Sequence, residues 1–142
     1  MPADQASSYR RKPYPMLHRQ PVRIVRTRKA HNFTPEGARY VGRPTLWANA
    51  FERRGIGHAR SVILYDNWLQ GHLSPYILRC AGFNEDEILA LERWRRRLMP
   101  QLIRLRGFDL QHWCPLSSPW CHADTQLRLV NGPISVLERL AA

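Results

Sequence analysis

The fold depends on one stretch, His112-Trp113-Cys114-Pro115-Leu116-Ser117-Ser118-Pro119-Trp120-Cys121-His122-Ala123-Asp124, which lies between two apolar segments. Residues 108–113 alternate like a strand, and residues 123–130 have the spacing of a helix. Pro115 and Pro119 are incompatible with a regular strand or helix between these segments. The stretch therefore predicts a strand, a proline-broken loop and a helix that begins at Cys121 or His122.

The same stretch gathers side chains that bind metal ions. His112, Cys114, Cys121 and His122 form an acceptable Cys2His2 set for zinc. Their spacing differs from that of a zinc finger, and the adjacent Cys121 and His122 cannot easily bind one ion. Asp124 could instead orient His122 through a hydrogen bond.

Two other interpretations of this loop stay open. A thiol of Cys121 at a helix N-terminus would have a lowered pKa, with His112 or His122 as its base and Asp124 fixing the tautomer. These residues would then form a nucleophilic site. Alternatively, the thiols pack in the core and Asp124 binds backbone N–H groups in the first turn of the helix.

The first strand is expected within residues 21–29, Pro21-Val22-Arg23-Ile24-Val25-Arg26-Thr27-Arg28-Lys29. Its β-branched residues favour a strand, and its end is strongly basic. Arg26 and Arg28 would present positive charge to a ligand at the carboxyl edge of the sheet.

A second block spans residues 40–51. Gly42 and Pro44 bracket Arg43, so Arg43 is held on a stiff turn that suits contact with an anion. Asn49 lies between Trp47 and Phe51 and is a candidate to hold a base-like group. We expect this block and the 112–124 loop to meet at one cleft.

Helices are expected over 57–70, 72–83, from Asn84 to about residue 98, and over 134–142. Asn84 and Glu87 have the spacing of a capping box. Cys80 has apolar neighbours, which predicts a thiol in the core. The long helix carries a basic outer or ligand-facing side, formed by Arg93, Arg95, Arg96 and Arg97.

These elements predict a small single domain of the α/β or α+β class, with a short mixed sheet flanked by helices. A flexible basic arm is expected at residues 1–20 and the globular domain at 21–133. Residues 134–142 would form a short C-terminal helix or tail.

Charge is the strongest global feature of the 142-residue chain, which has 22 Lys and Arg, 11 Asp and Glu, and a net charge of +11. Its excess of arginine favours a nucleic acid or a phosphorylated small molecule as partner. The sequence lacks an apolar run of about 20 residues, so a membrane partner is not expected. It has no apolar N-terminal segment, which predicts a cytoplasmic protein whose three cysteines are thiols or ligands.

Two blocks of the chain resemble the DUF4326 family, an uncharacterised group from bacteria and phages. Tyr40-Val41-Gly42-Arg43-Pro44 with Ala48-Asn49-Ala50-Phe51 is similar to the first block of the family, which has Gly and Pro where Ala48 and Ala50 stand. His112-Trp113-Cys114 with Cys121-His122-Ala123-Asp124 is similar to the second, which has Cys at position 112. A zinc site accepts His in place of Cys. The resemblance covers about residues 22–131 and implies no particular activity, but it marks both blocks as the site.

Together these features predict a basic protein that acts on or binds a nucleotide or nucleic acid. If it is an enzyme, a question the sequence leaves open, Cys121, His122 and Asp124 are the candidate catalytic residues. The alternative is a non-catalytic nucleic-acid-binding module with a structural Cys/His loop that could hold zinc. Basic residues at 10–12 and 93–97 would then contact phosphates. A protein-interaction domain built on the five tryptophans is a third alternative.

Overall fold

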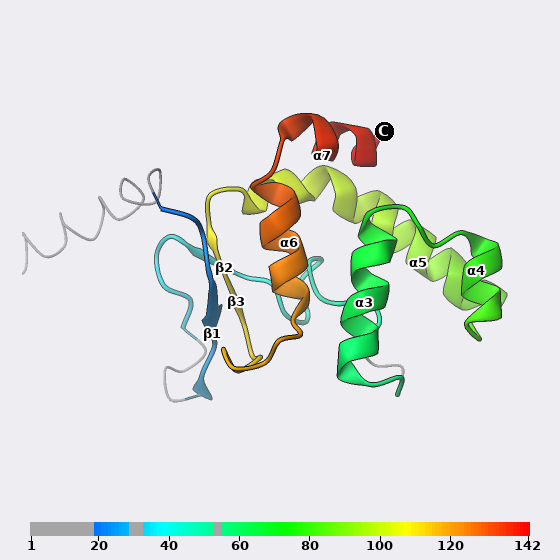
Figure 1. Ribbon diagram of the computed structural model, residues 1–142, viewed down its shortest axis with the longest axis horizontal. Helices are drawn as coiled ribbons and strands as arrows, with labels where there is room; N and C mark the ends of the chain where they lie inside the picture. The colour runs from blue at the N-terminus through cyan, green and yellow to red at the C-terminus, as the bar shows by residue number, and fades with distance from the viewer. Residues whose placement is uncertain (1–18, 29–32, 53–54) are drawn as a thin grey trace, which may run out of the picture.

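The computed structural model describes residues 19–28, 33–52 and 55–142 (Figure 1). Its strands are β1 (Arg23–Val25), β2 (Ala38–Tyr40) and β3 (Asp109–His112). Its helices are α3 (His58–Leu69), α4 (Pro75–Cys80), α5 (Glu85–Leu98), the 3-10 helix η2 (Met99–Leu105), α6 (His122–Val130) and α7 (Ile134–Ala141). Of the basic arm predicted at 1–20, residues 1–18 lie outside the described residues.

The strands form one parallel sheet in the order β1-β3-β2. Leu110 of β3 lies in register with Arg23 of β1 on one side and with Arg39 of β2 on the other. The predicted single α/β domain is confirmed, although the sheet is parallel throughout rather than mixed. The chain passes from β2 to β3 through α3, α4, α5 and η2, and parallel strands need such a crossover.

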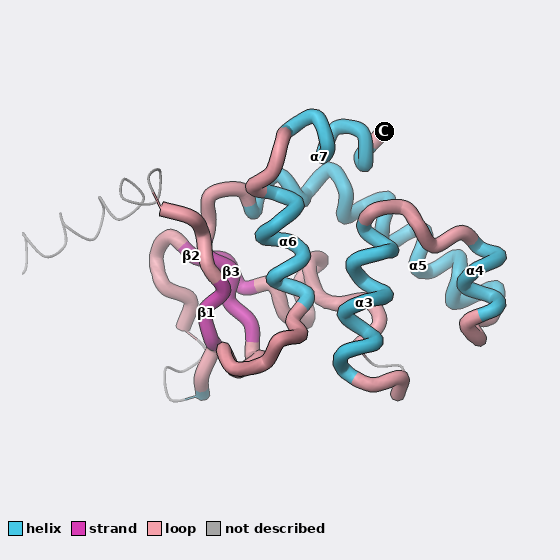
Figure 2. Tube along the Cα trace, in the orientation of Figure 1, coloured by secondary structure: helices cyan, strands magenta, loops and turns pink. Residues whose placement is uncertain are grey.

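β3 is the central strand, and all four of its residues are buried. Helix α6 packs against the sheet and lies between it and α3 (Figure 2). Because the loop 113–121 joins β3 directly to α6, the end of the central strand and the start of α6 are held close together. The predicted order of strand, loop and helix is confirmed, and the helix begins at His122 with Cys121 as its N-cap.

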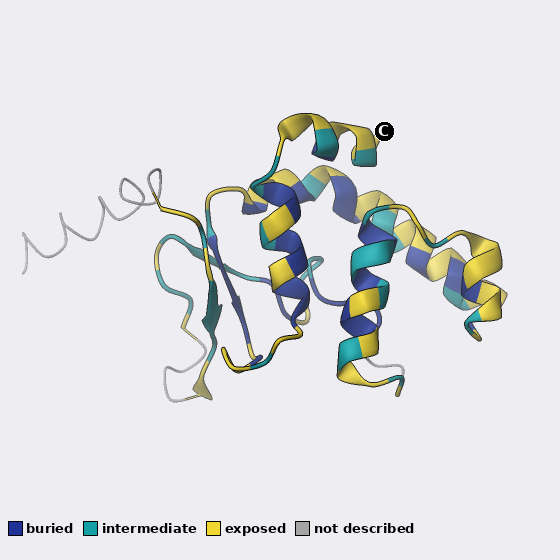
Figure 3. Cartoon of the chain, viewed as in Figure 1, coloured by how far each residue is buried: buried dark blue, intermediate teal, exposed yellow. Residues whose placement is uncertain are grey.

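The hydrophobic core lies where α3, α5 and α6 turn their buried sides toward one another (Figure 3). Phe51 is completely buried there, with its ring centroid 5.7 Å from that of Trp68 and 5.8 Å from that of Phe83. Both pairs have the edge-to-face geometry that aromatic rings favour. Phe51 therefore anchors the end of the 40–51 block in the core.

Helix α5 begins as predicted, with a capping box formed by Asn84 and Glu87. One of its four arginines serves the fold, because Arg95 donates hydrogen bonds of 2.9 Å to the carbonyl oxygens of Trp68 and Leu69 at the end of α3. The carbonyl oxygen of Trp68 also accepts from the backbone N–H of Gly71 (3.1 Å), so Arg95 adds a second donor there and supplies a donor to Leu69 in the last turn of α3.

The prediction of a core thiol at Cys80 is wrong, since Cys80 is exposed. It ends the short helix α4, in which only Leu78 is buried. Within the described ranges, no helix is long and apolar enough to cross a membrane.

Candidate functional site

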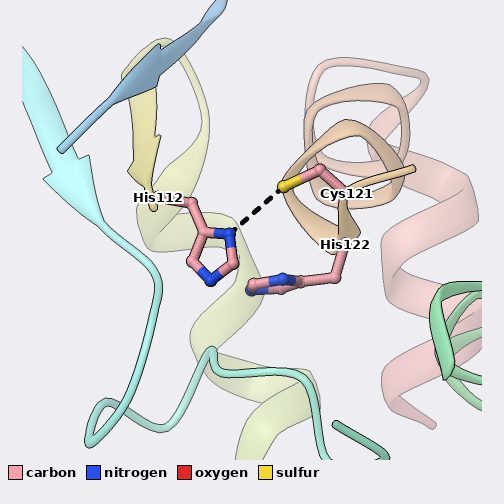
Figure 4. A group of neighbouring side chains, drawn as sticks. All are labelled: His112, Cys121 and His122. Carbon is pink, nitrogen blue, oxygen red and sulfur yellow. Dashed lines mark hydrogen bonds between the residues drawn. The ribbon is translucent and has the colours of Figure 1, made fainter. Parts of the chain in front are cut away.

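Side chains from β3 and α6 meet in a buried cluster (Figure 4). His112 ends β3, Cys121 caps α6 and His122 begins it. One ligand atom from each of these three residues lies within 4.8 Å of the other two. Cys114 reaches the cluster from the loop, with its Sγ 3.2 Å from His112 Nδ1. Three of the four predicted metal ligands therefore gather at one place, the adjacent Cys121 and His122 included, and Cys114 contacts this group through His112.

The spacing of the donor atoms fits a tetrahedral ion. His112 Nδ1 lies 3.2 Å from Cys114 Sγ and 3.4 Å from Cys121 Sγ. Zinc bonds of about 2.0 Å to nitrogen and about 2.3 Å to sulfur, at the tetrahedral angle, separate these two atoms by about 3.5 Å. The two distances from His112 Nδ1 are therefore close to those expected if His112 shared one zinc ion with each sulfur.

The ring of His122 is oriented by the first block. Its Nε2 lies 2.9 Å from the carbonyl oxygen of Val41, which can only accept a hydrogen bond. The neutral ring therefore carries its proton on Nε2 and keeps the lone pair on Nδ1. Histidine ligands of metals are commonly oriented by such a bond from the other ring nitrogen to a carbonyl oxygen.

Asp124 does not have the predicted role of orienting His122. Its Oδ2 lies 3.2 Å from Arg23 NH1, and the Asp124 side chain is half exposed. Burial raises the pKa of Asp124, and the charge of Arg23 opposes this. Of the three candidate catalytic residues, the structure brings Cys121 and His122 into contact and turns Asp124 toward Arg23.

A hydrogen bond between the two thiols separates their pKa values. The bond with Cys114, together with a bond to His112, lowers the pKa of Cys121 far below the usual range of a thiol, although burial opposes this. The bond with Cys121 and burial raise the pKa of Cys114. Cys121 is therefore the sulfur that carries negative charge most readily, and a thiolate is the form that binds metal ions.

Arg23 holds the loop in place, a role that the sequence pattern did not reveal. Its side chain is only 8% exposed although it belongs to β1. Its NH2 group donates hydrogen bonds to three loop carbonyl oxygens, at 3.3 Å to Pro115, 3.3 Å to Leu116 and 2.9 Å to Ser118. These bonds fix the loop backbone that carries Cys114 and Cys121. The alternation of residues along a strand does not predict that the guanidinium group of Arg23 is buried.

His58, the first residue of α3, also contacts the loop. Its Nε2 lies 2.7 Å from the carbonyl oxygen of Trp120 and 3.7 Å from Cys114 Sγ. His58 is exposed, so it lies at the outer side of the cluster. Its distance from the loop in the sequence explains why the local motif did not include it.

The two sequence blocks meet beside this cluster, at the carboxyl edge of the sheet. The backbone N–H of Arg26 donates to the carbonyl oxygen of His112 (2.8 Å), and that of Val41 donates to the carbonyl oxygen of Gln111 (3.0 Å). The residues that follow β1, β2 and β3 therefore share one edge. Ligands of open parallel sheets commonly bind at this edge.

Aromatic and basic side chains pack together there. The Arg26 guanidinium carbon lies 3.9 Å from the ring centroid of Tyr40 and 5.9 Å from that of Trp113. Trp113 Nε1 donates to the Tyr40 hydroxyl (3.1 Å), which donates to the carbonyl oxygen of Arg43 (2.8 Å). A Cβ atom at Gly42 would lie 2.4 Å from the same hydroxyl, so glycine allows Tyr40 to reach its position.

The predicted anion-binding residues differ in their surroundings. Arg28 and Arg43 are exposed, and Arg43 Nε lies 3.6 Å from a carboxylate oxygen of Glu52. Arg26 is partly buried, and its NH1 donates to Gln111 Oε1 (3.2 Å). Arg28 and Arg43 therefore keep guanidinium N–H groups for a ligand. The guanidinium of Arg26 is mostly used in contacts within the carboxyl edge.

Asn49 makes hydrogen bonds within the protein and is also among the residues that line a hollow between α5 and the 43–50 segment, so its contact with a ligand stays a prediction. It is 5% exposed, its Nδ2 donates to Ser61 Oγ (3.2 Å), and its Oδ1 accepts from the backbone N–H of Phe51 (2.9 Å). Both polar groups of the side chain are thus used inside the protein. They fix the second half of the 40–51 block against α3.

Comparison with known proteins places the chain in a family. No curated protein and no solved structure matches it significantly. The family model described as a domain of unknown function, DUF4326, matches residues 24–132. This match covers most of the 142-residue chain and includes both blocks. The chain therefore belongs to the DUF4326 family.

Proposed function

We propose that this protein binds a nucleotide or nucleic acid and that a closed, structural zinc centre holds its binding edge in shape. The observation that carries the proposal is the convergence of His112, Cys121 and His122 on one buried point behind that edge, with Cys114 Sγ 3.2 Å from His112 Nδ1. These residues link the central strand, the loop and helix α6. One ion bound there would join the three elements.

Zinc is the ion that fits the donor atoms best. Two thiolate sulfurs and two imidazole nitrogens form a set that structural zinc sites use, whereas magnesium and calcium prefer oxygen. The exposed fractions of His112, Cys114, Cys121 and His122 are 5%, 7%, 1% and 2%. A site so well covered leaves little room for a water or substrate ligand, which favours a structural role over a catalytic one.

Burial also argues against Cys121 as a nucleophile. An attacking thiolate must reach a substrate atom, and reactive cysteines are partly exposed. Cys121 is 1% exposed and its sulfur is surrounded by His112, His122 and Cys114. Among the hypotheses drawn from the sequence, the non-catalytic module is therefore better supported than the enzyme.

The proposed ligand follows from charge and position. Arg28 and Arg43 are exposed at or near the carboxyl edge, and the chain carries a net charge of +11. Guanidinium groups match phosphate oxygens in geometry and charge. Tyr40 and Trp113 add aromatic surface to the same edge, and aromatic rings support stacking with bases.

Elemental analysis of the purified, tag-free protein tests the zinc centre. We expect about one zinc per chain, because the three convergent donors and the neighbouring Cys114 would supply the four ligands of one tetrahedral site. The combined variant His112→Ala, Cys114→Ser, Cys121→Ser should lose this metal. Cys80→Ser is the matched control, because this thiol is exposed and outside the cluster. Preparation without chelators that yields neither zinc nor another metal would refute the centre.

Salt dependence tests the ligand. A labelled oligonucleotide should bind, and its affinity should fall steeply as salt rises, because binding to phosphates releases counterions. Arg43→Ala should weaken binding and reduce the slope of log affinity against log salt by about 1. Failure of the wild-type protein to bind any oligonucleotide or nucleotide at low salt would contradict the proposed function.

A further inference from the structure

Two hollows lie side by side along α5. The first has a volume of about 550 Å³ and lies between α5 and the 43–50 segment, with Arg43, Leu46, Trp94 and Arg97 among its lining residues. The second has a volume of about 600 Å³ and is lined by Ala90, Arg93, Trp94, Arg96 and Arg97. Trp94 and Arg97 belong to both linings, so the two hollows share a wall.

This surface is basic. Four arginines line the two hollows, and neither lining includes Asp or Glu. Arg96 pairs with Glu92 at 3.2 Å, and Arg43 Nε lies 3.6 Å from Glu52, but no hydrogen bond joins the Arg43 guanidinium to another described residue. No hydrogen bond or ion pair joins Arg93 or Arg97 to another described residue. Free guanidinium groups thus flank Trp94.

Trp94 is a fixed aromatic wall between the hollows. Its Nε1 donates to the carbonyl oxygen of Leu46 (2.9 Å), which ties the ring to the 43–50 segment. Its ring packs edge-to-face on Trp68, with centroids 6.3 Å apart. Because the ring is only partly buried, it keeps surface for a ligand. A fixed aromatic ring beside arginines is the combination that binds unpaired bases and their phosphates.

We propose that single-stranded nucleic acid crosses α5, with neighbouring nucleotides in the two hollows, bases against Trp94 and phosphates at Arg43, Arg93 and Arg97. This inference rests on the proposed function and specifies its ligand. A base must leave the stack of a duplex to enter a hollow, whereas a single strand offers its bases directly. Two adjacent hollows suit consecutive nucleotides better than one free nucleotide.

The test is titration of the full-length protein with labelled oligothymidylate, followed by fluorescence anisotropy, with a duplex of the same length as competitor. Arg97→Ala and Arg93→Ala should each weaken binding about tenfold, since each removes a charge-assisted contact with phosphate. Arg139→Ala removes the same charge from exposed α7 and should leave the affinity within about twofold. The duplex should compete poorly.

Three outcomes would overturn the inference. In the first, the variants Arg93→Ala and Arg97→Ala bind the single strand as tightly as wild type. The nucleic acid would then bind at another surface, and the proposed function would still hold. The second is a duplex that competes as well as the single strand, which would indicate phosphate contacts without base contacts. The third is no binding of any nucleic acid by the wild type, which would refute the proposed function as well.

Discussion

Removal of the proposed zinc ion with a strong chelator should lower the melting temperature of this protein by about 15 °C. A metal that binds only the folded state stabilises it by about 4 kcal/mol when its free concentration exceeds the dissociation constant a thousandfold. For a chain of this size, each kcal/mol changes the melting temperature by about 3–4 °C. The contacts of Phe51 with Trp68 and Phe83 do not involve the proposed ion, so we expect a destabilised protein rather than an unfolded one.

The measurement is thermal unfolding followed by circular dichroism, with and without chelator, and after zinc is added back. Re-addition should restore the original melting temperature. Cys80→Ser should show the same response to the chelator as wild type, because its side chain lies outside the cluster. An unchanged melting temperature in protein shown to be metal-free would mean that the four donors do not stabilise the fold through an ion.

Arg23→Met should reduce the free energy of unfolding by about 2–4 kcal/mol. Methionine keeps much of the apolar stem but cannot donate to the carbonyl oxygens of Pro115, Leu116 and Ser118. Hydrogen bonds from charged groups contribute about 1.5–3 kcal/mol each, and loop carbonyls that regain water recover part of this. Asp124 also loses its partner, although its half-exposed carboxylate keeps water as a substitute.

Urea unfolding of wild type and variant measures this difference. Arg79→Met is the matched control, because Arg79 forms an exposed ion pair with Glu85 and such pairs contribute little. We expect the control to lie within about 0.5 kcal/mol of wild type. Equal stability of Arg23→Met and Arg79→Met would show that Arg23 does not hold the loop.

Local signals in the sequence were sufficient to predict the helices and the site motif. The capping box at Asn84 and the start of α6 at Cys121 follow from side chains a few residues apart, and both are confirmed. The convergence of His112 with Cys121 also follows from local order, because a strand that leads through a short loop into a helix brings its ends together. These features depend on contacts between residues that are close in the sequence, and sequence patterns predict such contacts well.

Contacts between distant segments could not be predicted in the same way. The orienting partner of His122 is the backbone carbonyl of Val41, and no residue type in the sequence identifies a carbonyl as a hydrogen-bond acceptor. The pattern around Asn49 likewise does not predict its hydrogen bond to Ser61 on α3. Strand β2 has three residues and is recognised only by its pairing with β3.

For Cys80 and Arg23, the residue type suggests the wrong degree of burial. Cys80 has apolar neighbours, yet the short helix α4 buries only Leu78. Arg23 is charged, yet its side chain is covered because loop carbonyls meet it. Burial depends on what covers an element, which alternation within that element does not determine.

The position of β3 has a consequence for synthesis of the chain on the ribosome. Val22 and Asp109, which hydrogen-bond at the start of the sheet, are 87 positions apart. β1 and β2 have no direct pairing with each other, so neither can complete a sheet until β3 has emerged. Contacts of such long range slow folding. The segment from α3 to α5 can begin to collapse while translation continues, whereas the metal donors come together only near its end.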